Sequence, residues 1–181
     1  IGVCAARIRE AEVMNAAGIG GLLITSELVG PNKIGRLVRL TRKASETMSV
    51  VDNSSHAAQL SEAAEAANLT LNIMIDIDPL GRRTGIAPGP GAVDLAKTVD
   101  RLPGLSLRGV HGYSGASSHV MGYDERREHS IKHMTPVLDS FEGMNKAGLP
   151  AEIMSGASTG TYNIDSALKG MTELQVGSYA F

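Results

Sequence analysis

Two glycine-rich segments near the end of the chain have the residue types of an anion-binding site. Residues 155–162 and 176–181 each follow a short apolar run and combine glycine with serine, threonine or tyrosine. Small residues let the backbone approach a ligand closely, and hydroxyl and free N–H groups can donate hydrogen bonds to an anion. Each segment alone is also compatible with an ordinary turn. Two of them, after two consecutive late strands, favour a phosphate site.

A third polar segment, residues 76–85, follows the long apolar run 69–75. Asp76 and Asp78 stand close to Arg82 and Arg83 in this segment. An Asp–Arg ion pair in a surface turn is one interpretation, since such pairs are common and contribute little to stability. The functional interpretation is that Arg83 binds an anionic or phenolic oxygen of a ligand with its planar guanidinium group.

Residues 111–119 bring histidine, tyrosine and glycine into one loop. Histidine titrates near neutral pH and can act as a general acid or base. A single histidine is more often structural, and this interpretation is preferred for His111; His119 is the second histidine of the loop. The remaining histidines fall in helical patterns and are expected to be surface or packing residues: His56, His129 and His133.

Composition and charge exclude several classes of function. The 17 Lys and Arg residues are scattered among 19 Asp and Glu residues, so nucleic acid is not an expected partner. Apolar runs fall short of the about 18 residues that a membrane-spanning helix needs, and no secretory leader is visible. Cys4 is the single cysteine, and Asp76-x-Asp78 supplies too few ligands for a metal site. A soluble cytoplasmic protein without a metal site in this chain is expected.

Strands and helices alternate along the chain and must position these loops. Seven short runs are expected to be strands: residues 1–4, 21–25, 47–51, 69–77, 105–110, 151–154 and 173–176. Six amphipathic stretches between them are expected to be helices: residues 8–17, 33–43, 56–67, 92–102, 124–146 and 162–168. Runs that are apolar at successive positions are typical of a parallel sheet covered on both faces.

An open doubly wound sheet and a closed barrel both fit this alternation. In the open sheet the glycine-rich phosphate loop follows the first strand, whereas here the candidate loops follow the last two. The sequence therefore predicts an α/β fold of the (β/α)8 TIM-barrel type. Seven strands are one short of such a barrel, so residues 1–181 are expected to hold strands 2 to 8, with the first strand upstream of Ile1.

Several motifs, in order along the chain, carry a family resemblance. They are residues 1–4, Glu10-Ala-Glu12, Asp76-x-Asp78 with residues 81–85, and residues 111–115, 156–162 and 174–181. Together they resemble the D-threonine aldolase and D-serine dehydratase family, whose members are alanine-racemase-like, fold-type III pyridoxal-phosphate enzymes. The resemblance implies a homodimer in which each subunit has an N-terminal (β/α)8 barrel and a C-terminal β-domain.

The resemblance also implies roles for individual residues. Those expected to bind the cofactor are Thr159, Gly177 and Ser178 at the phosphate, with Tyr179 adjacent, and Tyr113 and Arg83 at the ring. Tyr113 is expected to meet the pyridine ring and its nitrogen, and Arg83 the phenolic oxygen. His119 matches the histidine that, in the aldolases, is proposed to take the proton from the β-hydroxyl of the substrate.

Two parts of the family's site are expected outside this chain. The lysine that forms the Schiff base belongs to the first barrel strand, upstream of Ile1, and no lysine here lies at a strand end suited to replace it. The divalent metal, Mn, Mg or Zn, is held by the C-terminal domain, which is expected after Phe181. Residues 1–181 are therefore expected to be a partial pyridoxal-phosphate-binding barrel domain.

The activity implied by the resemblance is a metal-assisted lyase that cleaves D-3-hydroxyamino acids, such as D-threonine, to glycine and an aldehyde. A dehydratase for D-serine or D-3-hydroxyaspartate, or a D-3-hydroxyaspartate aldolase, fits the same scaffold. A non-catalytic pyridoxal-phosphate carrier barrel is an alternative from another class, and an unrelated sugar-phosphate barrel is a third. A small D-amino acid is the expected substrate.

Overall fold

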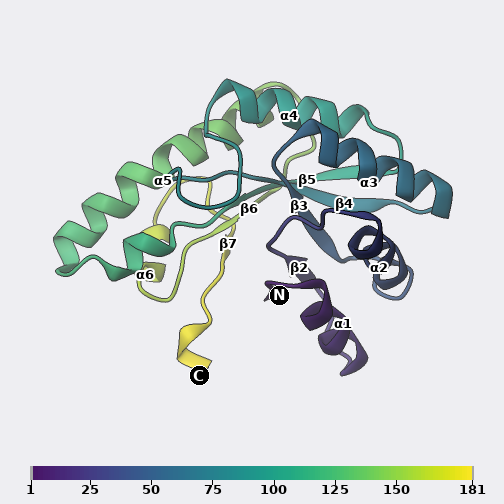
Figure 1. The fold of residues 1–181 in the computed structure, drawn as a ribbon. Coiled ribbons are helices and arrows are strands. Elements are labelled where there is room, and N and C mark those ends of the chain that lie inside the picture. The colour runs from purple at the N-terminus through teal and green to yellow at the C-terminus, as the bar shows by residue number, and fades with distance from the viewer. Residues whose placement is uncertain (1, 181) are drawn as a thin grey trace.

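A curled sheet of seven parallel strands forms the centre of the computed structural model, which describes residues 2–180 (Figure 1). The strands are β1 Val3–Ala5, β2 Leu22–Ile24, β3 Met48–Val51, β4 Leu71–Asp76, β5 Leu105–Gly112, β6 Ile153–Gly156 and β7 Glu173–Leu174. They follow one another in chain order, with β1 and β7 at the edges. A doubly wound sheet would reverse this order at a switch point, so the predicted incomplete barrel is confirmed for the described residues.

Helices lie around the outside of the curled sheet and connect successive strands (Figure 1). They are α1 Ile8–Ala16, α2 Pro31–Thr41, α3 Ser54–Ala67, α4 Pro90–Arg101, α5 Tyr123–Lys146 and α6 Tyr162–Asp165. Two short 3-10 helices, η1 Gly115–His119 and η2 Ser178–Ala180, follow β5 and β7. Within residues 2–180, no helix combines the length and the apolar character needed to cross a bilayer.

Local sequence signals explain where several helices begin. Pro31 and Pro90 occupy the first position of α2 and α4, where a missing backbone N–H costs nothing. Asn53 caps α3, because its side-chain oxygen accepts the backbone N–H of His56 at 2.8 Å. These helix starts place the preceding loops at the carboxyl ends of the strands.

Strand β5 is longer than the sequence predicts. It continues to Gly112 instead of ending at residue 110, so His111 lies within the strand and not in the loop after it. The reason is pairing on both sides, since His111 is in register with Asp76 of β4 and with Ser155 of β6. Helix α6 and strand β7 are shorter than predicted, and Ile1 of the first expected strand lies outside the described residues.

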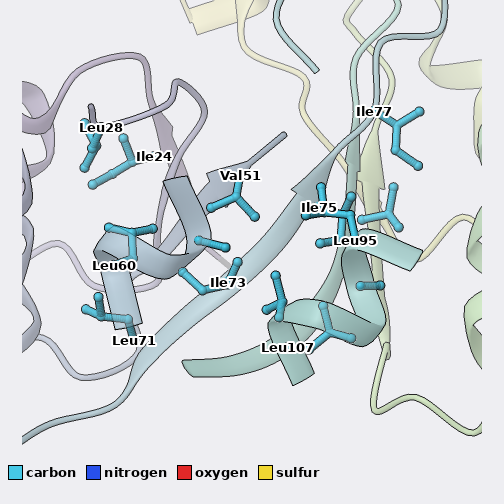
Figure 2. Close-up of a cluster of buried hydrophobic side chains, with 14 of the residues drawn as sticks. Ile24, Leu28, Val51, Leu60, Leu71, Ile73, Ile75, Ile77, Leu95 and Leu107 are labelled. Atoms are coloured by element: carbon cyan, nitrogen blue, oxygen red, sulfur yellow. The ribbon is translucent and has the colours of Figure 1, made fainter. Parts of the chain in front are cut away.

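Two hydrophobic clusters lie on opposite faces of the sheet. The larger one fills the space between strands and helices and includes Ile73 and Ile75 of β4 (Figure 2). The smaller one, inside the curl, consists of Leu23, Val50 and Met74, with Met48 and Ile153 packed against it. Because side chains alternate along a strand, Ile73 and Ile75 point outward while Met74 and Asp76 point inward. The carboxylate of Asp76 therefore lies next to the inner hydrophobic cluster.

Candidate functional site

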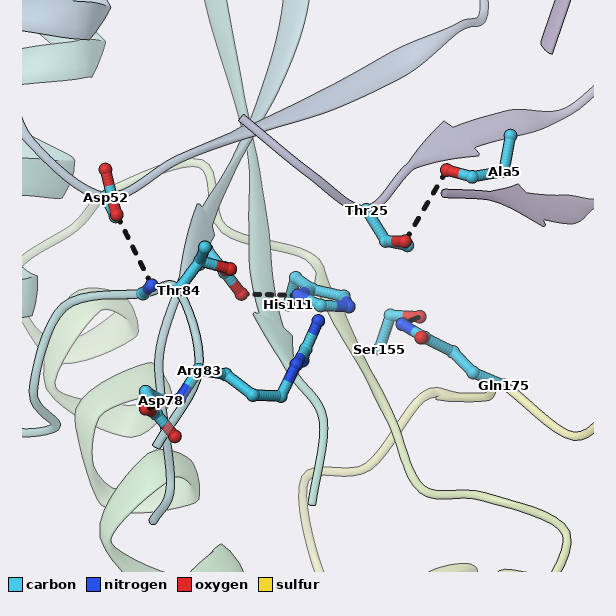
Figure 3. A network of polar contacts seen from close by, with 11 residues as sticks. Ala5, Thr25, Asp52, Asp78, Arg83, Thr84, His111, Ser155 and Gln175 are labelled. Carbon is cyan, nitrogen blue, oxygen red and sulfur yellow. Dashed lines mark hydrogen bonds and ion pairs between the residues drawn. The ribbon is translucent and has the colours of Figure 1, made fainter. Parts of the chain in front are cut away.

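A polar layer lies at the carboxyl ends of the strands, next to the inner cluster (Figure 3). Its side chains are Thr25, Asp52, Asp76, His111, Ser155 and Gln175. Asp76, His111 and Ser155 are paired in register on three neighbouring strands, and residues paired in this way point to the same face of a sheet. Barrel enzymes place their active sites at this end of the strands.

A buried carboxylate–imidazole pair is the most enclosed part of this layer. The Oδ1 atom of Asp76 lies 2.5 Å from Nδ1 of His111, and each side chain is 1% exposed. The hydroxyl of Thr84 donates to the other carboxylate oxygen at 3.0 Å. Asp76 thereby ties strand β5 to the loop that follows β4.

The loop after β4 folds back on itself around Asp78. Its carboxylate accepts the backbone N–H of Arg83 at 2.6 Å and that of Leu80 at 3.0 Å. Burial acts to raise the pKa of Asp78, but these backbone hydrogen bonds outweigh burial and hold the pKa below its ordinary value. Gly85 has a φ of +115°, and a Cβ there would lie 2.6 Å from the backbone nitrogen of Asp78. Only glycine fits at this position, where the backbone at residue 85 passes close to the backbone of Asp78.

Arg83 contacts an aromatic ring instead of a carboxylate. The interpretation of this loop as an Asp–Arg ion pair is wrong for the described residues, because Asp76 binds an imidazole and a hydroxyl while Asp78 binds backbone N–H groups. The guanidinium carbon of Arg83 lies 5.3 Å from the ring centre of Tyr113, a cation–π contact. The structure thus brings together the two residues that were expected at the cofactor ring.

The two late loops meet at Thr159. Its side-chain oxygen accepts the backbone N–H of Gly177 at 3.1 Å and that of Ser178 at 3.0 Å. Two successive N–H groups that converge on one point form an anion-binding geometry. Nothing lies within 4 Å of the position that a Cβ of Gly177 would take, so this glycine borders open space. The three residues expected to hold phosphate therefore lie together, and Tyr179 next to them is 75% exposed.

A buried carboxylate anchors the first of these loops. Asp165 is 0% exposed and accepts the hydroxyl of Thr161 at 2.6 Å and that of Ser130 at 2.5 Å. Ser158 is hydrogen-bonded to Ser118 of η1, which joins this loop to the loop after β5. These contacts fix the backbone on which Thr159 sits.

His119 lies apart from the buried pair. It is exposed at the end of η1, while Ser117 in the same short helix is hydrogen-bonded to His129 of α5 at 2.9 Å. In the described part of the chain, no hydrogen bond or ion pair joins His119 to Asp76 or His111. Its role in proton transfer stays a prediction.

The sequence did not reveal that Glu27, in the loop after β2, lies close to the polar layer and has a raised pKa. Burial raises the pKa of Glu27 to about 7, and the nearby carboxylates of Asp76 and Asp52 act in the same direction. Glu27 was one of several polar residues at strand ends, and only its proximity to two other carboxylates distinguishes it. His111 was considered and interpreted as structural, and its pairing with Asp76 was not predicted, because this partner lies 35 residues away along the chain.

Residues 2–180 contain no group of three or more His, Cys, Asp or Glu residues that could hold a metal ion. His129 and His133, one helical turn apart on α5, have a spacing that is found in metal sites, which sequence reasoning overlooked. Their rings stack with centroids 4.3 Å apart. Burial lowers the pKa of His133, and the neighbouring His129 and Lys132 lower it further.

Several known proteins resemble this chain in fold and in sequence. Residues 2–181 match the family described as alanine racemase, N-terminal domain. The crystal structure of D-threonine aldolase from Filomicrobium marinum is similar with a TM-score of 0.95 at 36% identity, over 100% of this chain and 49% of that one. The 3-hydroxy-D-aspartate aldolase of Paracoccus denitrificans (strain Pd 1222) is 33% identical, over 100% of this chain and 47% of the relative.

A dehydratase is also among the similar proteins. The D-threo-3-hydroxyaspartate dehydratase from Delftia sp. HT23 has a TM-score of 0.87 at 25% identity, over 100% of this chain and 48% of that one. The chain therefore spans about half the length of the relatives that it matches. The family match covers the curled sheet and all the strand-end loops described above. The chain belongs to the alanine racemase N-terminal domain family, and its resemblance to the D-threonine aldolases is confirmed.

Proposed function

We propose that residues 1–181 form the pyridoxal-phosphate-binding barrel of a lyase that acts on D-3-hydroxyamino acids. The observation that carries this proposal is the convergence of the Gly177 and Ser178 N–H groups on the side-chain oxygen of Thr159, at 3.1 and 3.0 Å. Both N–H groups donate to Thr159 in the structure, and we propose that a phosphate oxygen accepts from them when the cofactor binds. Family membership and the similarity to two aldolases support the proposal.

The residues present fit both ends of the cofactor. The N–H groups beside Thr159 are suited to its phosphate, and the open space at Gly177 leaves room for it. At the other end, Arg83 is suited to the phenolic oxygen and Tyr113 to the ring nitrogen, and the two side chains already touch. The lysine anchor and a divalent metal, Mn, Mg or Zn, are proposed to come from outside residues 1–181. One variant of a D-threo-3-hydroxyaspartate dehydratase has been solved in a metal-free form, which supports a metal among the relatives.

A side chain of the protein must remove the proton of the substrate β-hydroxyl, because the cofactor does not do so. When bound, pyridoxal phosphate withdraws electrons from the bonds at Cα of the amino acid. We assign removal of the hydroxyl proton to His119, which is exposed at the end of η1. As this proton leaves, the O–H electron pair would form the aldehyde C=O bond, the Cα–Cβ bond would break with its electron pair left at Cα, and a proton taken up at Cα would complete glycine. D-Threonine would give glycine and acetaldehyde.

The second candidate is a dehydratase on the same barrel. The similarity to the Delftia enzyme, with a TM-score of 0.87, favours it. In that reaction the α-proton is removed and the β-hydroxyl leaves, so that ammonia and a 2-oxo acid are the final products. Both candidates are proposed as cytoplasmic homodimers that act on a small D-amino acid.

Product analysis tests the proposed reaction. The full-length protein, loaded with pyridoxal phosphate, is incubated with D-threonine and, as a control, with L-threonine. Acetaldehyde and glycine from D-threonine alone support the aldolase, whereas ammonia and a 2-oxo acid support the dehydratase. A protein that binds the cofactor but converts no D-3-hydroxyamino acid contradicts the proposed lyase.

A further inference from the structure

Ser118, in the short helix η1, directly precedes His119 and contacts the loop that carries Thr159. Its hydroxyl is hydrogen-bonded to the hydroxyl of Ser158. The backbone of the same loop also lies against Ser118, because a Cβ added at Gly160 would lie 2.7 Å from the Cβ of Ser118 and 3.0 Å from its carbonyl oxygen. Both neighbours of Thr159 in the chain thus contact one residue of η1.

The loop after β6 is held in a fixed conformation. Ala157 is buried and has a φ of +64°, which costs free energy for a residue other than glycine and persists only where the surroundings enforce it. The backbone N–H of Ser158 donates to Oγ1 of Thr161 at 3.2 Å, and Thr161 donates to the buried carboxylate of Asp165 at 2.6 Å. Because the loop is fixed in this way, a displacement of Thr159 moves the residues on either side of it.

A second anchor joins η1 to helix α5. Ser117 is fully buried, and its hydroxyl oxygen lies 2.5 Å from that of Ser114 and 2.9 Å from Nδ1 of His129. Neither of these contacts involves the loop after β6. The anchor at Ser118 is therefore the one that joins η1 to the proposed phosphate site.

Phosphate binding would change the contacts of Thr159. Its side-chain oxygen accepts the backbone N–H groups of Gly177 and Ser178, at 3.1 and 3.0 Å. Under the proposed function these N–H groups donate to the phosphate instead, and the hydroxyl of Thr159 becomes free to donate to the same anion. The loop is then fastened to the anion at Thr159 and to η1 at the residues on either side of it.

We propose that Ser118 is a positioning residue, which holds η1 against the Thr159 loop so that phosphate binding sets the position of His119 for proton transfer. This inference rests on the proposed function, which assigns the phosphate to Thr159 and proton transfer to His119. The position of a base is critical, because a displacement of about 1 Å can lower a rate by about 100-fold. Cofactor binding therefore places the base before the substrate reacts.

The variant Ser118→Ala removes the hydroxyl contact and keeps the Cβ that lies against Gly160. In the full-length protein we expect kcat for D-threonine to fall about 5-fold, the size of one neutral hydrogen bond, while the Kd for pyridoxal phosphate stays within about 2-fold of the wild type. Ser158→Ala breaks the same contact from the other side, so the double variant should lose no more activity than either single variant.

Ser166→Ala, at an exposed site after α6, is the matched control and should change neither constant. An unchanged kcat in folded Ser118→Ala, or losses that multiply in the double variant, overturn the proposal.

NMR of histidine-labelled full-length apoprotein tests the link to the phosphate site directly. Inorganic phosphate, and then pyridoxal phosphate, is added at constant pH, with chloride at equal ionic strength as the control. We expect the ring signals of His119 to move in the wild type and to move much less in Ser118→Ala. Ser117→Ala breaks the other anchor of η1, so its His119 signals should still respond.

His119 signals that neither ligand moves in the wild type, or that respond equally in Ser118→Ala, overturn the proposal while leaving the proposed function intact. Loss of the response in Ser117→Ala as well would indicate a general loosening of η1 and would also overturn it. If the wild-type protein takes up no pyridoxal phosphate, the proposed function fails and this inference fails with it.

Discussion

The side-chain oxygen of Thr159, in the loop after β6, lies 3.1 Å from the backbone nitrogen of Gly177, in the loop after β7. This contact joins the two loops whose composition first indicated an anion site. It also marks the point toward which the N–H groups of Gly177 and Ser178 are directed. The phosphate of the cofactor is proposed to bind next to this point.

Removing the Thr159 hydroxyl should weaken cofactor binding. Thr159→Val keeps the shape of the side chain but loses the hydroxyl that aligns the two loops, and the loss of one polar contact to a charged group predicts roughly 10-fold weaker binding of pyridoxal phosphate. The Kd is measured by absorbance titration of the apoprotein. Thr135→Val, at an exposed site on α5, is the control, and equal Kd values for the two variants would count against the phosphate site.

Two glycine substitutions should have opposite effects. Nothing lies within 4 Å of a Cβ added at Gly177, so Gly177→Ala should keep its thermal stability but bind the cofactor more weakly, because the methyl group occupies ligand space. At Gly156 an added Cβ would lie 2.3 Å from the carbonyl oxygen of Gly112, so Gly156→Ala should unfold at a lower temperature. Thermal melting and cofactor titration of both variants check this. Normal cofactor binding by Gly177→Ala would show that no ligand approaches there.

Tyr113→Phe and His119→Ala should separate cofactor binding from turnover. Tyr113→Phe keeps the ring that Arg83 contacts but removes its hydroxyl, so the Kd for pyridoxal phosphate should rise. His119→Ala should leave this Kd unchanged and lower kcat by about 100-fold to 10,000-fold, as expected for the loss of a general base. Both constants are measured on each variant. Unchanged kinetics in both variants would overturn these assignments.

Glu27 should make stability depend on pH. Burial, together with the nearby carboxylate of Asp76, raises its pKa from 4.5 to about 7, so the folded protein keeps a proton that the unfolded chain releases. Its contribution to stability is therefore complete below pH 4.5 and is lost as the pH rises through about 7. Glu27→Gln stays neutral, so its melting temperature should fall less than that of the wild type across this window. Exposed Glu152→Gln is the control, and parallel melting curves for Glu27→Gln and wild type would contradict the prediction.

Alternation of apolar and helical patterns predicted the seven strands, and the position of the glycine-rich loops after the last two strands predicted the incomplete barrel. These features depend on local periodicity and on the order of the loops, which a single sequence contains. The approach of the two late loops could be predicted for the same reason, because loops after consecutive strands of a parallel sheet lie side by side, whereas the choice of Thr159, Gly177 and Ser178 within them came from the family resemblance. The Arg83–Tyr113 contact required the family resemblance as well.

The buried pair of Asp76 and His111 could not be predicted in this way. Their contact depends on the register between β4 and β5, and that register includes an irregularity between Ile73 and Met74. A shift of one residue would have turned one of the two side chains to the other face of the sheet. The raised pKa of Glu27 likewise depends on burial and on the carboxylates of Asp52, after β3, and Asp76, at the end of β4, which the curvature of the sheet brings close to the loop after β2.

Titration of the full-length apoprotein with pyridoxal phosphate, followed by borohydride reduction and peptide mapping, tests the central claim most directly. We predict saturable binding of one cofactor per subunit and a reduced label on a lysine outside residues 1–181. The same titration of Thr159→Val should show weaker binding. Failure to bind pyridoxal phosphate, or a label on one of the lysines within residues 1–181, would contradict the proposed site.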